Sequence, residues 1–139
     1  MLGLRNMLIG ENGRNRNLIK LAFAKGKLDE LDIEYINRNF SKLNISDSEI
    51  KSSKNKIESL ESAVPAEKFE RYKLLFGLMK IMMIRDIVTD RSEKVLKGVA
   101  EVLMKNANNV NELVHFLKFN IKYGNSTEES YSRLGYLID

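Results

Sequence analysis

Four acidic side chains near two polar turns are the residues in this sequence best suited to chemistry. Asp29 and Asp32 follow the first turn, and Asp86 and Asp90 lie at the second. Carboxylate oxygens are the ligands that hard cations such as Ca²⁺ and Mg²⁺ prefer. A calcium loop would add alternate acids and a bidentate glutamate at fixed spacing, and neither turn has them. Carboxylates also cap helix N-termini by accepting backbone N–H hydrogen bonds. We therefore favour capping, predict no metal site, and keep a weak divalent-cation site as the alternative.

The other candidate groups do not assemble into a catalytic site. His115 is the only histidine and there is no cysteine, which excludes disulfides, zinc–thiolate sites and thiol catalysis. The sequence has no G-x-S-x-G elbow, P-loop or G-x-G-x-x-G stretch, and no set of nucleophile, base and orienting group can be assembled. We interpret His115 as structural. The sequence predicts a protein that is not an enzyme, has no catalytic residue and binds no cofactor.

A repeat determines the elements that must position these residues. Residues 18–43 read LIKLAFAKGKLDELDIEYINRNFSKL, and residues 78–103 read LMKIMMIRDIVTDRSEKVLKGVAEVL, so the offset is sixty residues without a gap. Each copy reads as an apolar helix, a polar turn and an amphipathic helix. In the turns, Leu28 aligns with Val88 as an apolar plug. The duplicated helical hairpin predicts an all-α fold, packed as a compact helical bundle.

About seven helices are predicted from hydrophobic spacing and from capping signals. Glu11 to Gly13 reads as a turn after a short N-terminal arm, and Gly26 and Gly124 are placed to end helices. Asp29 and Thr89 are placed to cap the second helix of each copy. No run alternates with period two, so no strand is predicted. The predicted helices span about 1–9, 17–25, 29–43, 46–60, 65–85, 89–103 and 110–123.

The apolar positions of these helices predict the core. The run from Leu74 to Ile84 is too short for a membrane span, which needs about 20 residues, and reads as a central buried helix. The predicted core residues are Leu21, Phe23, Leu28, Ile36, Phe40, Leu75, Leu78, Ile81, Met82, Val88, Leu96, Val99, Leu103, Phe116 and Leu117.

The turn AKGKLDELD, residues 24–32, carries a family resemblance together with its second copy and the stretch PAEKFER, residues 65–71. It resembles the TerB-like family of tellurite-resistance proteins, whose members read A-D-G-x-I-[ST]-x-x-E in two internal repeats. The resemblance covers residues 17–106. It implies two pseudo-symmetric helical halves, a bacterial stress-associated role, and metal binding by acids near the turns. The family's aspartate position holds Lys25 and Arg85 here, whose positive charges repel a cation. Metal binding is therefore not carried over.

The positive net charge is compatible with nucleic-acid binding. The distribution of the charged residues along the chain argues against it. The net charge is +4, but most basic residues alternate with acidic ones along the predicted helices. No aromatic residue is interleaved with the basic ones at 51–56, as single-strand binding would require. Nucleic-acid binding stays as a second alternative. The remaining basic residues form two clusters: Arg5, Arg14, Arg16 and Lys20, and Lys51, Lys54 and Lys56.

The two ends carry apolar groups that the repeat does not use. We predict one TerB-like domain over 1–139, with an N-terminal arm at 1–16, the duplicated core at 17–123 and a C-terminal tail at 124–139. Contiguous apolar groups rarely stay in water, so each end packs either on its own core, which we favour, or on another chain. The candidates for partner binding are Tyr136, Leu137 and Ile138.

The sequence therefore predicts a non-enzymatic binding or scaffold module. Its partner would be an unknown protein or a second copy of the chain. Nothing resembles a signal peptide and there is no cysteine, so we expect a cytoplasmic protein without a membrane span.

Overall fold

The computed structural model describes residues 2–84 and 89–139, with side chains from residue 13 onward. Every regular element in these ranges is helical, which confirms the predicted all-α class. The chain divides into an N-terminal unit, Met1–Ala63, and a C-terminal unit, Val64–Asp139. No helix in the described ranges has the length and the apolar character needed to cross a membrane.

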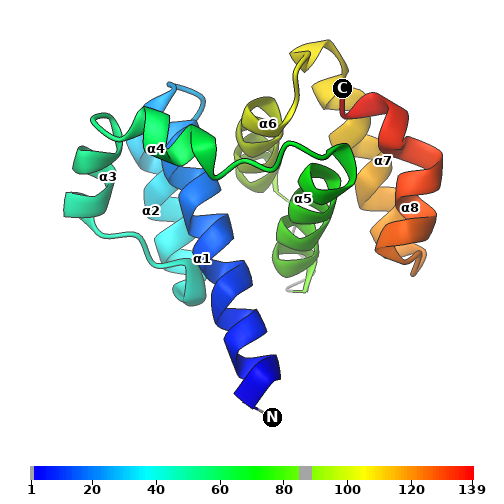
Figure 1. Ribbon diagram of the computed structural model, residues 1–139, viewed down its shortest axis with the longest axis horizontal. Helices are drawn as coiled ribbons and strands as arrows, with labels where there is room; N and C mark the ends of the chain where they lie inside the picture. The colour runs from blue at the N-terminus through cyan, green and yellow to red at the C-terminus, as the bar shows by residue number, and fades with distance from the viewer. Residues whose placement is uncertain (1, 85–88) are drawn as a thin grey trace. The chain divides into compact units, whose positions relative to one another are not determined.

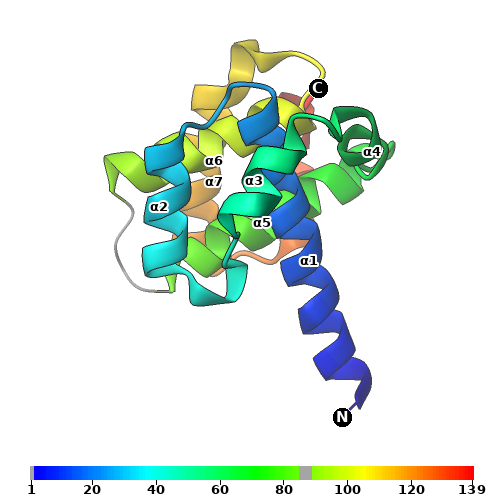
Figure 2. The same cartoon turned by 90° about the vertical axis from the view of Figure 1, so that its left-hand side faces the viewer.

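The N-terminal unit is built on one long helix. Helix α1 contacts the 3₁₀-helix η1, α3 and α4, and Figure 2 shows α3 lying against it. Three buried residues of α1, Leu18, Ile19 and Leu21, supply its core face. The elements of this unit are α1 (Leu2–Ala24), α2 (Glu30–Asn39), η1 (Ser41–Leu43), α3 (Asp47–Ser53) and α4 (Ile57–Ser62).

Helix α1 corrects the predicted N-terminus. The helix runs without a break from Leu2 to Ala24, so the predicted arm is continuous from Leu2 onward with the first helix of the repeat, and the turn predicted at Glu11 to Gly13 is wrong. A glycine inside a helix costs only about 1 kcal/mol relative to alanine. Continuing the helix through Gly13 keeps the backbone hydrogen bonds that a turn would give up, which offsets that cost.

The turn of the first repeat copy follows its prediction closely. Gly26 adopts φ +77°, its N–H donates to the Phe23 carbonyl, and the Lys27 N–H donates to the Ala22 carbonyl at 2.8 Å. This pair of bonds is a Schellman ending, which requires a left-handed residue and so favours glycine. Leu28 then turns inward and is buried, as predicted.

The C-terminal unit surrounds helix α5 with α6, α7 and α8 (Figure 1). Tyr72, Leu75, Leu78, Met79 and Met82 of α5 are fully buried, which confirms that this apolar run is a buried helix. Its elements are α5 (Lys68–Met83), α6 (Asp90–Leu103), the 3₁₀-helix η2 (Ala107–Asn109), α7 (Val110–Lys122), α8 (Thr127–Leu134) and the 3₁₀-helix η3 (Gly135–Leu137).

Most of the predicted core is buried, with two departures. Ile81 is only half-buried, and Phe116 is 44% exposed, so its assignment to the core is wrong. The neighbouring residues Leu113 and Leu117 bury the inner face of α7 instead. Val88 lies outside the described residues.

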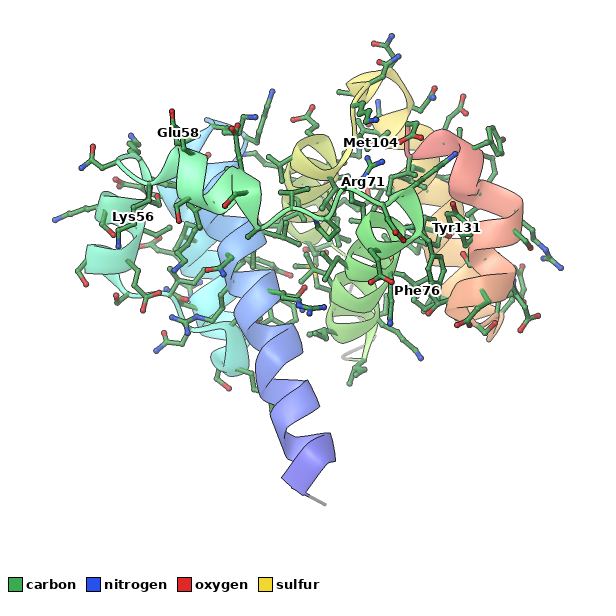
Figure 3. The ribbon with its side chains drawn as sticks, in the orientation of Figure 1. Lys56, Glu58, Arg71, Phe76, Met104 and Tyr131 are labelled. Atoms are coloured by element: carbon green, nitrogen blue, oxygen red, sulfur yellow. The ribbon has the colours of Figure 1, made fainter. Side chains whose placement is uncertain are left out.

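The predicted C-terminal tail folds onto its own unit. It forms α8 and η3, which contact α5 and α7. Tyr72 of α5 and Ser130 of α8 share a buried hydrogen bond, and burial raises the pKa of the Tyr72 phenol while that bond opposes the rise. Tyr131 of α8 also packs edge-on against Tyr72, with ring centroids 5.3 Å apart. Figure 3 labels four residues of this unit: Arg71, Phe76, Met104 and Tyr131.

Candidate functional site

Two of the acidic candidates, Asp29 and Asp32, act as a helix cap. The Asp32 N–H donates to Asp29 Oδ1 and the Asp29 N–H donates to Asp32 Oδ2, both at 2.9 Å, which forms a capping box at the start of α2. Asp32 is fully buried. Asp90 is exposed in the first turn of α6, and Asp86 lies outside the described residues. The capping interpretation is confirmed for Asp29 and Asp32.

These acids do not form a cation site in the described part of the chain. No group of three or more His, Asp or Glu side chains there is arranged to hold a metal ion.

The C-terminal candidates for partner binding separate into buried and exposed groups. Leu137 and Ile138 are 2% and 0% exposed, so they form part of the core of their own unit. Tyr136 between them is 68% exposed. Of the three candidates, only Tyr136 has an exposed side chain.

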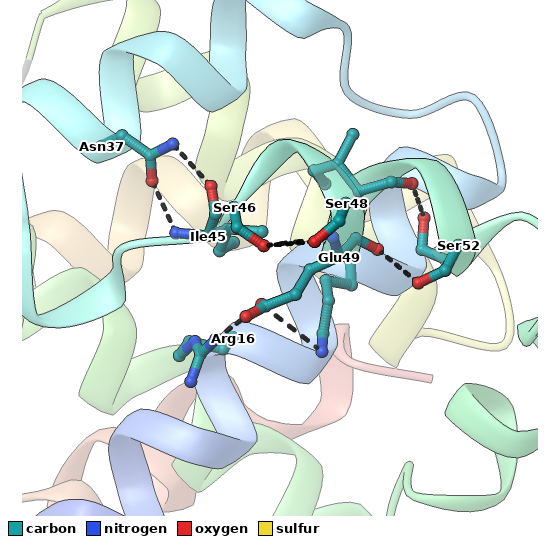
Figure 4. Close-up of polar contacts among 10 residues, drawn as sticks. Arg16, Asn37, Ile45, Ser46, Ser48, Glu49 and Ser52 are labelled. Carbon is teal, nitrogen blue, oxygen red and sulfur yellow. Dashed lines mark hydrogen bonds and ion pairs between the residues drawn. The ribbon is translucent and has the colours of Figure 1, made fainter.

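The first basic cluster is partly engaged within the N-terminal unit. Arg16 Nη2 lies 2.5 Å from Glu49 Oε2 on α3, and Lys20 Nζ lies 3.8 Å from the same oxygen (Figure 4). Asn37 closes the neighbouring loop by pairing its side-chain amide with both backbone groups of Ile45 at 2.8 Å. Arg16 and Lys20 therefore join α1 to α3.

The basic residues around the first turn also have local partners. Lys25 Nζ lies 2.9 Å from Glu61 Oε1 of α4. Lys54 places its ammonium 5.4 Å from the centre of the Phe23 ring. At the start of α4, Lys56 and Glu58 are exposed with opposite charges (Figure 3). We find no continuous basic stripe over these residues.

The strongest surface feature is an aromatic face on α7 that the sequence did not predict. His115, Phe116, Phe119 and Tyr123 form it, and we call these four residues the α7 aromatic face. Phe116 is 44% exposed, Phe119 37% and Tyr123 76%. The signal for this face was the spacing of 115, 119 and 123, since residues four apart lie on the same side of a helix.

The rings of the α7 aromatic face contact one another. The His115 ring meets Phe116 edge-on at 5.3 Å and Phe119 edge-on at 5.0 Å between centroids. The Phe119 and Tyr123 rings are stacked at 6.3 Å. These separations lie within the 4.5–7 Å range of favourable aromatic pairs. The four side chains therefore form one continuous patch on the helix surface.

A groove of about 600 Å³ between α6 and α7 adjoins this face. It has both charged and apolar walls, and Glu93, one of the lining residues, forms an ion pair of 3.0 Å through Oε1 with Lys118 Nζ of α7. The residues lining it are Glu93, Lys97, Asn111, Glu112, Val114, His115 and Phe116. Aromatic edges beside mixed charges suit the binding of another protein surface.

No protein-family model, curated protein or solved structure matches this chain.

Proposed function

We propose that this protein is a non-enzymatic binding or scaffold module of TerB-like type in the cytoplasm, and that it binds a protein partner through the α7 aromatic face. The observation that carries the proposal is the exposure of three large aromatic side chains, Phe116, Phe119 and Tyr123, in one contiguous patch. Such patches on a protein surface mark interaction sites, whereas apolar residues scattered singly are ordinary.

The composition of the face supports binding energetically. Aromatic residues are enriched at the centres of protein interfaces, where a few of them supply most of the binding energy. Burial of apolar surface contributes roughly 25 cal/mol per Å² removed from water. The exposed parts of Phe116 and Tyr123 are large enough for this term to matter on binding.

The face lies on a helix that packs against its own unit and has a defined ending, which reduces the entropic cost of binding. On the inner side of α7, Leu113, Val114 and Leu117 are buried. The Lys118–Glu93 ion pair joins α7 to α6. Beyond its C-terminus, Gly124 at φ +80° donates to the Ile121 carbonyl and gives the helix a fixed ending. A surface that is already ordered loses little freedom when a partner binds.

The TerB-like part of the proposal is supported by equivalent caps in the two copies. Asp29 and Asp32 form a capping box at α2, and Thr89 and Ser92 form one at α6, sixty residues further on. Matched caps at the same offset extend the sequence repeat into local structure. The stress-associated role is an expectation from the family resemblance.

A photo-crosslinking amino acid at position 123 tests the binding proposal in cells that express the full chain. We expect discrete crosslinked products that disappear when Phe119→Ala is added to the same chain. The matched control places the crosslinker at Leu31, an apolar residue of the N-terminal unit that is 59% exposed. Equal products from positions 31 and 123, or products at 123 that Phe119→Ala does not change, would contradict the proposal.

A further inference from the structure

We propose that the α7 aromatic face binds the same face of a second copy of this chain, with the two α7 helices antiparallel about a two-fold axis. This inference rests on the proposed function and names its partner. It is carried by the order of charged and aromatic residues along α7.

The exposed stripe of α7 has the spacing of a helix–helix contact. Glu112, His115, Phe119 and Lys122 follow one another at intervals of three, four and three residues, and all four are exposed. This is the spacing of the contact seam in paired helices, where positions repeat every seven residues. Phe116 and Tyr123 lie beside the seam and widen its apolar part.

A two-fold axis brings each position of the stripe opposite another position of the stripe in the second copy. It places the acidic end of one stripe against the basic end of the other. Glu112 and Lys122 each lie five residues from Leu117, and His115 and Phe119 each lie two residues from it. An antiparallel pair centred at Leu117 brings Glu112 opposite Lys122 of the second copy. It also brings His115 opposite Phe119 of the second copy. Each contact occurs twice, as a two-fold interface requires.

Charge complementarity selects this arrangement over the parallel one. In a parallel pair, Glu112 would lie near Glu112 of the second copy, and Lys122 near Lys122 of the second copy. Like charges in register repel. Lys118 is already engaged by Glu93 within the unit. Glu112 and Lys122 have no ion-pair partner among the residues that the structure describes. Their charges are therefore available to a second copy.

The size of the surface sets the strength of the contact. Stable interfaces bury about 800 Å² on each partner, and one face of a 13-residue helix supplies less than this. The dimer is therefore weak, reversible and dependent on protein concentration. A dissociation constant in the micromolar range or above is expected for a surface of this class.

Sedimentation velocity of the purified full chain, from micromolar to about millimolar concentration, tests the dimer. We expect the average mass to rise from one chain toward two. Glu112→Lys alone and Lys122→Glu alone should each weaken the dimer about fivefold to tenfold, because each reverses one member of two symmetric pairs. The double variant Glu112→Lys/Lys122→Glu restores opposite charges at both ends and should recover most of the affinity.

Two further variants complete the test. Glu34→Lys makes the same charge change at an exposed site in the N-terminal unit and should leave the dimer unchanged. Phe119→Ala should abolish it, with far-UV circular dichroism confirming that the helices are retained. A chain that stays monomeric at every concentration overturns the dimer, as does a double variant no stronger than the single ones.

The outcome separates this inference from the function on which it rests. A monomeric pure protein whose residue 123 still crosslinks to a different protein removes the dimer and keeps the binding function. A monomeric protein without specific crosslinks removes both.

Discussion

At the residue scale, Arg71 of the C-terminal unit needs polar partners, because this charged residue is only 4% exposed. Its guanidinium donates to the Leu103 carbonyl and to Asp139 Oδ1, both at 2.8 Å. A buried charge without partners is strongly destabilising, so these two contacts fix where the chain beyond α8 can lie. They connect the start of α5, the end of α6 and the end of the tail.

The Arg71–Asp139 contact predicts an acid-dependent loss of stability. The hydrogen bond from Arg71 holds the pKa of the Asp139 carboxyl below its usual value, with desolvation opposing it and the charges of Arg71, Lys68 and Lys105 adding to it. A lowered folded-state pKa gives stability that is complete above the unfolded pKa of about 3.9 and is lost as the pH falls through the folded value.

Asp139→Asn tests this pH dependence by urea unfolding between pH 7 and pH 2. The wild type should be more stable at neutral pH, and the difference should vanish toward the acid end of the range. Glu34→Gln, at an exposed site, serves as the control. A difference that stays constant or grows with acidification would count against the ionic contact.

The hydrogen bond between Tyr72 and Ser130 should couple the contributions of the two side chains to the free energy of unfolding. Both side chains are fully buried, so Tyr72→Phe leaves the Ser130 hydroxyl without this partner and should cost about 1–3 kcal/mol. The double variant Tyr72→Phe/Ser130→Ala should cost less than the sum of the two single variants, by about 1 kcal/mol. Urea unfolding of all four chains measures this coupling, and strict additivity would refute it.

At the element scale, the helix ends determine how each hairpin turns. Two glycines should respond in opposite directions to the same change. Gly26→Ala forces a Cβ into the left-handed region at φ +77° and should destabilise the protein by about 1–2 kcal/mol. Gly77→Ala lies inside α5, where an added Cβ meets no atom within 4 Å, and should stabilise by about 0.5–1 kcal/mol. Thermal unfolding of both variants checks the signs. A stabilising Gly26→Ala would exclude the Schellman ending.

The two capping boxes should contribute similar free energies because they occupy equivalent places in the repeat. Asp29→Ala and Thr89→Ala should each lower the free energy of unfolding by about 0.5–2 kcal/mol. Ser59→Ala, at an exposed position inside α4, is the control and should change it by less than about 0.5 kcal/mol. Chemical denaturation gives all three values. An effect at only one of the two caps would show that the repeat is not equivalent in energy.

The local features of these elements could be predicted from the sequence, and the choice of buried face could not. Asp29, Thr89 and Gly26 act within a few residues of themselves, so their roles follow from short-range chemistry alone. Phe116 is different, because Leu113 is a helical neighbour of both Phe116 and Leu117, and the spacing allows either to face inward. Packing against α5 and α6 buries Leu117 and leaves Phe116 outside. The α7 aromatic face was missed for the same reason.

At the scale of the whole molecule, the N-terminal half of α1 shows how helix continuity overrides a local turn signal. The Glu11 to Gly13 sequence has the composition of a turn, yet the helix continues through it. The sequence also predicts one domain, whereas the structure divides into Met1–Ala63 and Val64–Asp139. Compactness of each part does not decide whether they unfold together. Whether the two units unfold together depends on the free energy that couples them, and unfolding experiments can measure it.

Two cavity-forming variants, one in each unit, test the one-domain prediction. Leu78→Ala in α5 and Ile36→Ala in α2 both truncate fully buried side chains and should each cost about 2–5 kcal/mol. If the chain is one domain, differential scanning calorimetry shows one transition, and either variant lowers all of it by roughly 5–15 °C. Leu31→Ala, at an apolar site that is 59% exposed, should leave the midpoint nearly unchanged. Two transitions, each lowered by only one of the variants, would overturn the prediction and make each unit a domain of its own.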